Sequence, residues 1–216
     1  MLEKKAGIGK AALLEDEPRQ PFFSSLGKSF SRYIRSRDRV FLWLAYLAWF
    51  VSFEAMSNLS LFTRHAMGRE PSDFTGIILA LRFGFKALAG YGLGLLNIRY
   101  GVRAPLFATV AMLGLAMLWA WMVPGYFYLA AFGLMGAGEL GGVYFPNTLL
   151  TWSPPSLAAR DMSILNLATP ASAPAAALHG ILADHFGFPA SFIFGIATAA
   201  AALIFVGKLP KGKGQR

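Results

Sequence analysis

The sequence predicts an all-helical integral membrane protein with six transmembrane helices, and three observations carry this prediction. Hydrophobic residues make up 56% of the 216 residues and charged residues only 14%, whereas soluble domains contain about 45–50% and about 25%. The mean hydropathy of the chain is +0.50. Six apolar stretches are also long enough for a helix to cross the hydrocarbon core, which takes about 20 residues.

The six predicted spans follow one another between two basic tails. They cover residues 40–63, 74–96, 104–123, 126–150, 163–183 and 189–207. The chain therefore divides into a basic cytoplasmic tail at 1–39, a transmembrane domain at 40–208 and a second basic cytoplasmic tail at 209–216. Within the first tail, residues 22–37 alternate aromatic and basic side chains at helical spacing. This pattern predicts an amphipathic helix on the inner membrane face, with a solvated linker as the alternative.

The basic residues orient the spans. With both termini in the cytoplasm, 16 of the 20 Lys and Arg residues lie on the inner side, two on the outer side and two within a span. This asymmetry predicts a multi-pass protein of the cell membrane with both termini cytoplasmic. The same residues flank apolar blocks and do not line an exposed face, so we expect the lipid bilayer and no nucleic acid as a partner.

Four ionisable residues lie inside the predicted spans: Glu54, Arg82, Lys86 and Glu139. At about 1.5 Å per residue, they lie about 12–18 Å from the outer ends of their spans. Arg82 and Lys86 share one helix face, because they are four residues apart. Buried charges in membranes usually serve function, so we expect a water-lined cavity that binds a polar solute or relays protons. Structural ion pairs that fix helix packing are the alternative.

Three further residues are weaker candidates for the same site. His179 lies in the fifth span, where a hydrogen-bonded packing role is favoured over a proton-carrying one, and Asn58 and Tyr91 are possible polar contacts. No serine, threonine or histidine lies in a nucleophile or metal-ligand motif, and the chain has no cysteine. We therefore expect no enzymatic activity, no cofactor and no metal.

An internal similarity indicates a repeat. Residues 94–103 read GLLNIRYGVR and residues 180–189 read GILADHFGFP, so both contain G-x-L-x-x-x-x-G. The two copies are separated by three spans and therefore face opposite sides of the membrane, as a 3+3 inverted repeat requires. G-x-x-x-G spacings at Gly90 and Gly94 and at Gly138 and Gly142 also predict close approaches between helices.

The first copy resembles the loop motif G-x-L-a-D-R-x-G-R-R of the major facilitator superfamily. It matches at Gly94, Leu96, Arg99, Gly101 and Arg103, and departs at Ile98 and Val102. The resemblance extends over about residues 38–208 and is greatest to the C-terminal half of these transporters. It implies a six-helix half of a twelve-helix protein, with the solute bound between the halves. It also implies that the first, second, fourth and fifth helices face the cavity.

The predicted function is therefore half of a secondary active transporter, which moves a small polar solute by alternating access. Arg82 and Lys86 favour an anionic solute, such as an organic acid or a phosphorylated compound. Glu54 and Glu139 would act as counter-charges or proton carriers. A non-transporting helical subunit of a larger membrane complex is the alternative. The chain would form a homodimer, pair with a separate six-helix half, or be a fragment, and the sequence leaves these possibilities open.

Overall fold

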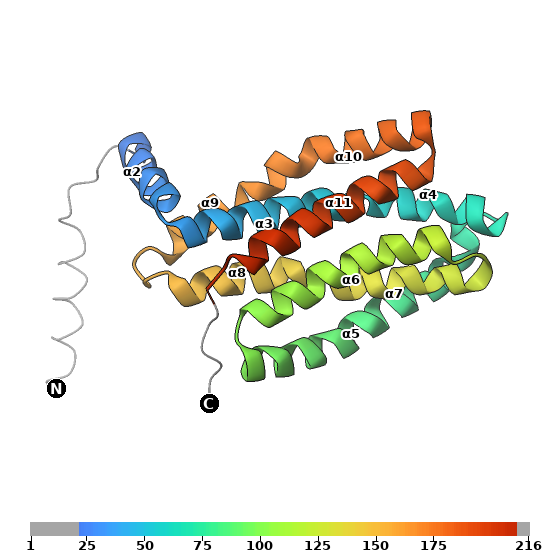
Figure 1. Cartoon of the computed structure of the whole chain (residues 1–216), viewed down its shortest axis with the longest axis horizontal. Helices are drawn as coiled ribbons and strands as arrows, with labels where there is room; N and C mark the ends of the chain where they lie inside the picture. Colours follow the sequence, from blue (N-terminus) through green and yellow to red (C-terminus); the bar gives the residue numbers. More distant parts are fainter. Residues whose placement is uncertain (1–21, 211–216) are drawn as a thin grey trace, which may run out of the picture.

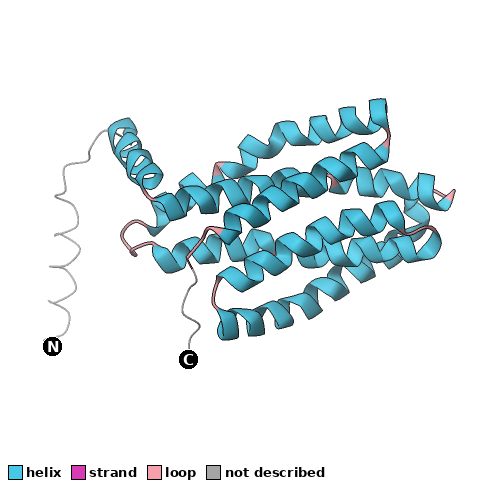
Figure 2. Cartoon of the chain, in the orientation of Figure 1, coloured by secondary structure: helices cyan, strands magenta, loops and turns pink. Residues whose placement is uncertain are grey.

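The computed structural model describes residues 22–210, and every regular element in that range is helical (Figure 2). Residues 1–21 and 211–216, which belong to the two predicted basic tails, lie outside the described residues. The elements are α2 (Phe22–Arg35), α3 (Arg37–Phe53), α4 (Met56–Met67), η1 (Pro71–Phe74), α5 (Thr75–Tyr100), α6 (Arg103–Met122), η2 (Gly125–Leu129), α7 (Ala130–Gly138), α8 (Gly141–Trp152), α9 (Ala158–Asn166), α10 (Ala168–Phe186) and α11 (Phe188–Gly207).

Four helical segments are long and apolar enough to cross a membrane. They are Arg37–Met67, Pro71–Tyr100, Arg103–Met122 and Phe188–Gly207, which correspond to the first, second, third and sixth predicted spans. The fourth predicted span falls on η2, α7 and α8, and the fifth on α9 and α10. These two stretches are less regular because glycines and prolines interrupt them. The chain is thus an all-helical protein with several helices of membrane-spanning length.

Three helical stretches are interrupted within their length. The break between α3 and α4 lies at Glu54, the break between α7 and α8 at Glu139, and the break between α9 and α10 at Leu167. Pro170 explains the third break, because proline lacks the N–H that would continue the helix. The glycines around Glu139 explain the second. The sequence around Glu54 contains no glycine or proline that would explain the first.

The bundle is built around α3, α6, α7 and α11. Helix α11 packs along both α3 and α6, and α6 packs along α7. Helix α10 packs on α3 and α5 packs on α7, so these two helices lie at opposite edges of the bundle (Figure 1). The core between them holds fully buried apolar side chains, among them Leu42, Leu113, Met117 and Phe192.

Two tight turns of the same shape join α5 to α6 and α10 to α11. Gly101 has φ 79° and ψ 177°, and Gly187 has φ 82° and ψ 163°. Side chains with a Cβ rarely adopt positive φ values, so both turns favour glycine. These residues are the second glycines of the two predicted repeat motifs, which therefore share a backbone conformation as well as a sequence pattern.

Glycines on α7 allow α5 to approach closely. A Cβ atom at Gly136 would overlap the carbonyl oxygen of Arg82, and one at Gly133 would lie 2.8 Å from the Phe85 ring. The predicted close approach at Gly138 is present, since its Cβ would lie 3.1 Å from Leu113. Within residues 22–210 the structure shows no such approach at Gly94, since a Cβ there would meet none of their atoms within 4 Å.

We expect the substitution Gly136→Ala to lower the free energy of unfolding by about 1–3 kcal/mol, the usual cost of overpacking. The added methyl group would force α5 away from α7. Thermal unfolding in detergent measures the effect. Gly84→Ala on α5 is the matched control, because a Cβ at Gly84 meets nothing within 4 Å. Equal unfolding temperatures for the two variants would contradict the close packing.

Candidate functional site

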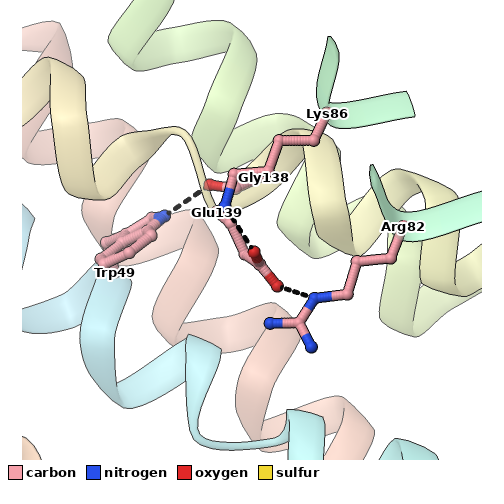
Figure 3. Close-up of polar contacts among 5 residues, drawn as sticks. All are labelled: Trp49, Arg82, Lys86, Gly138 and Glu139. Atoms are coloured by element: carbon pink, nitrogen blue, oxygen red, sulfur yellow. Dashed lines mark hydrogen bonds and ion pairs between the residues drawn. The ribbon is translucent and has the colours of Figure 1, made fainter. Parts of the chain in front are cut away.

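The candidate site is a cluster of three charged side chains, Arg82, Lys86 and Glu139. Each oxygen of the Glu139 carboxylate takes one base: Arg82 Nε donates to Oε1, and Lys86 Nζ donates to Oε2 at 2.9 Å. Figure 3 shows both bases reaching from α5 toward Glu139, which lies at the break between α7 and α8. The cluster thus joins the predicted second and fourth spans.

The cluster carries an excess of one positive charge and is open on one side. The side chain of Glu139 is 8% exposed, whereas those of Arg82 and Lys86 are 25% and 35% exposed. The carboxylate is therefore covered, while both bases remain accessible from outside the bundle along α5. A guanidinium and an ammonium group side by side can bind a carboxylate or a phosphate through charge-assisted hydrogen bonds.

A tryptophan from α3 supports the backbone beside Glu139. The Gly142 N–H bonds to the carbonyl of Glu139 at 3.0 Å, which leaves the carbonyl of Gly138 free. Trp49 Nε1 donates to that carbonyl at 3.2 Å (Figure 3). Gly141 has room for no side chain, because a Cβ there would lie 2.5 Å from Trp49 Nε1. Trp49 therefore fixes the backbone beside Glu139, while Arg82 and Lys86 of α5 hold its carboxylate.

Glu54 and Tyr91 lie apart from the contacts of this cluster. Glu54 lies half-buried at the break between α3 and α4, and among residues 22–210 it forms no ion pair within 4.0 Å. The structure thus brings together three of the four charged residues predicted for one site, and the formal charges of these three sum to +1. Tyr91 is 75% exposed on α5, so it faces away from the bundle.

His179 and Asn58 belong to a separate buried network with Ser191. His179 Nε2 donates to the carbonyl of Val51 at 2.9 Å, which is free because the Ala55 N–H bonds elsewhere. His179 Nδ1 lies 2.8 Å from Ser191 Oγ, and the Asn58 amide donates to Ser191 Oγ and to the His179 carbonyl, both at 2.8 Å. A neutral imidazole with its proton on Nε2 satisfies both ring nitrogens, and this favours the packing role for His179.

A third ring N–H donates close to the remaining break. Trp43 Nε1 donates at 3.2 Å to the carbonyl of Ile164 near the end of α9, which also accepts from the Leu167 N–H at 3.2 Å. Each of the three interruptions therefore has a carbonyl that bonds to a ring N–H from another helix. These contacts could not be predicted from the sequence, because spacing along the chain does not show which tryptophan or histidine faces a distant break.

A buried ion pair at one end of the bundle was also missed. Arg39 Nη1 lies 3.1 Å from Asp161 Oδ2, and their side chains are 13% and 5% exposed. Ser153 Oγ donates to the same carboxylate oxygen at 2.6 Å. Both charges lie at the edges of predicted spans, where charged residues were attributed to loops.

The residues of the predicted loop motif surround the turn between α5 and α6. Gly94 and Arg99 lie in the second half of α5, and Gly101 forms the turn. Arg103 begins α6 and donates from Nη1 to the carbonyl of Leu209 at 3.2 Å. The motif thus has a structural role here, because Arg103 ties the start of α6 to the segment that follows α11.

Comparisons with protein families, curated proteins and solved structures find no match for this chain. The relationship to the major facilitator superfamily therefore stays a prediction based on the motifs quoted above. The geometry of the charged cluster has to carry the functional argument.

We expect Glu139→Gln to lower the free energy of unfolding by about 1–3 kcal/mol, because it leaves Arg82 and Lys86 without a carboxylate. The loss is smaller than the roughly 3–5 kcal/mol of a fully buried pair, since both bases are partly exposed. Thermal unfolding in detergent measures it. Glu70→Gln is the control: its pair with Arg64 spans 3.2 Å on the exposed surface, where such pairs contribute less than about 1 kcal/mol. An equal loss of stability in both variants would show that the Glu139 cluster contributes no more than the exposed Arg64–Glu70 pair.

We expect Ser191→Ala to destabilise the protein by about 1–3 kcal/mol, because it removes one partner each from His179 and Asn58 in a buried site. Ser163→Ala on α9 should change stability little, since its hydroxyl bonds only to the carbonyl of Ala159 in its own helix. The unfolding temperatures of the two variants and the unaltered chain measure how much the Ser191 network contributes to stability. A silent Ser191→Ala would mean that the network contributes nothing to stability.

Proposed function

We propose that the six helical stretches cross the membrane as a 3+3 inverted repeat. Exchanging the first three stretches with the last three turns each main packing contact into another, except that of α6 with α11, which maps onto itself. The contact of α5 with α7 corresponds to that of α10 with α3, and the contact of α6 with α7 corresponds to that of α11 with α3. The matching turns at Gly101 and Gly187 support the same symmetry. The breaks at Glu54 and Glu139, 85 residues apart, support it as well.

We propose further that the chain is half of a secondary active transporter for a small anionic solute. The observation that carries this proposal is the cluster of Arg82, Lys86 and Glu139, which has one unmatched positive charge and two accessible bases. Charged residues within membrane-spanning segments are energetically costly and are usually functional. A solute carboxylate or phosphate would replace the Glu139 carboxylate on the two bases, and Glu139 would return when the solute leaves. Glu54 remains a candidate proton carrier.

The partner in this proposal is a second six-helix half or a second copy of the chain. It would cover the flank of α5, where Phe83, Leu88 and Tyr91 are 57%, 74% and 75% exposed. The proposed orientation places both termini in the cytoplasm. The end of the bundle that carries α2 supports this orientation, because the described Lys and Arg residues gather there in accordance with the positive-inside rule.

A non-transporting subunit of a larger membrane complex remains a second candidate. The observation that favours it is that Glu139 already binds both bases, as expected for ion pairs that fix helix packing. The same exposed flank of α5 would then contact a fixed partner. Solute binding by the purified chain separates the two proposals.

We expect succinate or glycerol 3-phosphate to raise the unfolding temperature of the purified chain, and neutral glycerol to have no effect. Arg82→Ala should weaken binding about 10–100-fold, because charge-assisted hydrogen bonds contribute about 1.5–3 kcal/mol. Uptake of the same compounds into proteoliposomes tests transport directly.

Arg69→Ala is the control variant, since Arg69 is exposed between α4 and η1. It should bind and transport like the unaltered chain. Binding that is unaffected by Arg82→Ala would exclude the cluster as the solute site. The absence of both binding and flux, with crosslinking to one fixed heterologous partner, would establish the subunit role instead.

A further inference from the structure

Helix α2 differs from the other helices in its direction. Figure 1 shows it at one end of the bundle, set crosswise to α3 and its neighbours. If the bundle stands along the membrane normal, α2 lies along the membrane surface. The predicted amphipathic helix at 22–37 corresponds to this element, which ends at Arg35.

One tyrosine anchors α2 to the bundle. Tyr33 is only 2% exposed, and α2 packs on α3 and α9. The guanidinium carbon of Arg39 lies 5.9 Å from the centre of the Tyr33 ring. Burial raises the pKa of the Tyr33 hydroxyl, and the charge of nearby Asp161 raises it further, so this side chain stays neutral. The anchor gives α2 a fixed position over the Arg39–Asp161 pair.

The rest of the described surface of α2 combines exposed apolar and basic side chains. Phe30 and Ile34 are 46% and 52% exposed, and Arg32 and Arg35 are exposed beside them. Helix α2 contains no acidic residue, and among residues 22–210 no carboxylate lies within 4.0 Å of Arg32 or Arg35. Two cations beside an apolar strip fit an acidic lipid surface.

A shallow, open groove of about 430 Å³ lies on the surface of α2 beside these basic side chains. Gly27, Ser31, Arg32 and Arg35 line it. Gly27, Ser31 and Arg35 follow one another at four-residue spacing, so they form one row along the helix. Among the described residues, a Cβ at Gly27 would meet no atom within 4 Å, next to one hydroxyl and two guanidinium groups.

The surrounding end of the bundle is strongly basic. The helix ends that meet there contribute six further cations and only two acids, Asp38 and Asp161. Of these two acids, Asp161 is buried against Arg39. The cations are Arg37, Arg39, Arg99, Arg103, Arg160 and Lys208. Such an end attracts the acidic leaflet of a membrane.

We propose that the groove on α2 binds the phosphate headgroup of an anionic phospholipid. Arg32 and Arg35 bind the phosphate, the Ser31 hydroxyl donates to it, and Phe30 and Ile34 contact the acyl chains. The neighbouring apolar side chains favour a lipid over a soluble phosphate compound, because a soluble ligand would leave them in water. This site stands whether or not the chain transports a solute.

The test titrates phosphatidylglycerol into the full chain in a neutral detergent and counts bound lipids by native mass spectrometry, with phosphatidylcholine as the reference. We expect a preference for phosphatidylglycerol. The double substitution Arg32→Gln/Arg35→Gln should weaken it about 30-fold, the factor for two basic side chains at an acidic leaflet. Arg64→Gln/Arg69→Gln at the opposite end of the bundle is the matched control and should leave the preference unchanged.

Gly27→Glu provides a second variant that keeps both arginines. It places a carboxylate in the groove without a steric clash and should also abolish the preference. Retention of the preference in both groove variants would overturn the proposal, as would an equal loss in the control. Competition by glycerol 3-phosphate at the affinity of the lipid would show a soluble phosphate site and overturn the lipid assignment.

Discussion

The hydrogen bonds between ring N–H groups and the carbonyls of interrupted helices hold this fold in place. An unpaired carbonyl in hydrocarbon costs several kcal/mol, so a broken helix persists there only if another group satisfies it. Trp49 of α3 and His179 of α10 satisfy carbonyls left without a backbone partner at the breaks of the fourth and first stretches, and Trp43 of α3 adds a second donor to the Ile164 carbonyl near the break of the fifth. Helix α3 is thus the central element, since it takes part in all three contacts.

The charged cluster depends on this arrangement. The break at Glu139 directs its carboxylate toward α5, and Trp49 fixes the backbone from the opposite side. The glycines of α7 then let α5 come close enough for Arg82 and Lys86 to reach the carboxylate. The close approach of α5 to α7 therefore brings both bases within hydrogen-bond distance of Glu139. The local backbone, the packing of α5 and the electrostatics of the cluster are therefore coupled.

The helical class, the approximate positions of the helices and the amphipathic helix could be predicted from the sequence, because hydropathy and helical spacing are local properties. The pairing of Glu139 with two bases could also be predicted, since all three residues lie at similar depth in their predicted spans. The separation of Glu54 from them was not, because depth does not show which way a side chain faces. The Arg39–Asp161 pair and the ring N–H contacts join residues more than 80 positions apart, and one sequence carries no local signal for such contacts.

The single-residue connection at Gly187 has a consequence for biogenesis. Helix α10 carries Pro174, Ser172 and a buried histidine, and such a segment partitions poorly into lipid by itself. Helix α11 is the most apolar of the membrane-length segments, with a mean hydropathy of 2.1, and its Ser191 already contacts His179 across the turn. In the proposed topology the two helices would leave the translocon as one hairpin, with the second carrying the first into the bilayer.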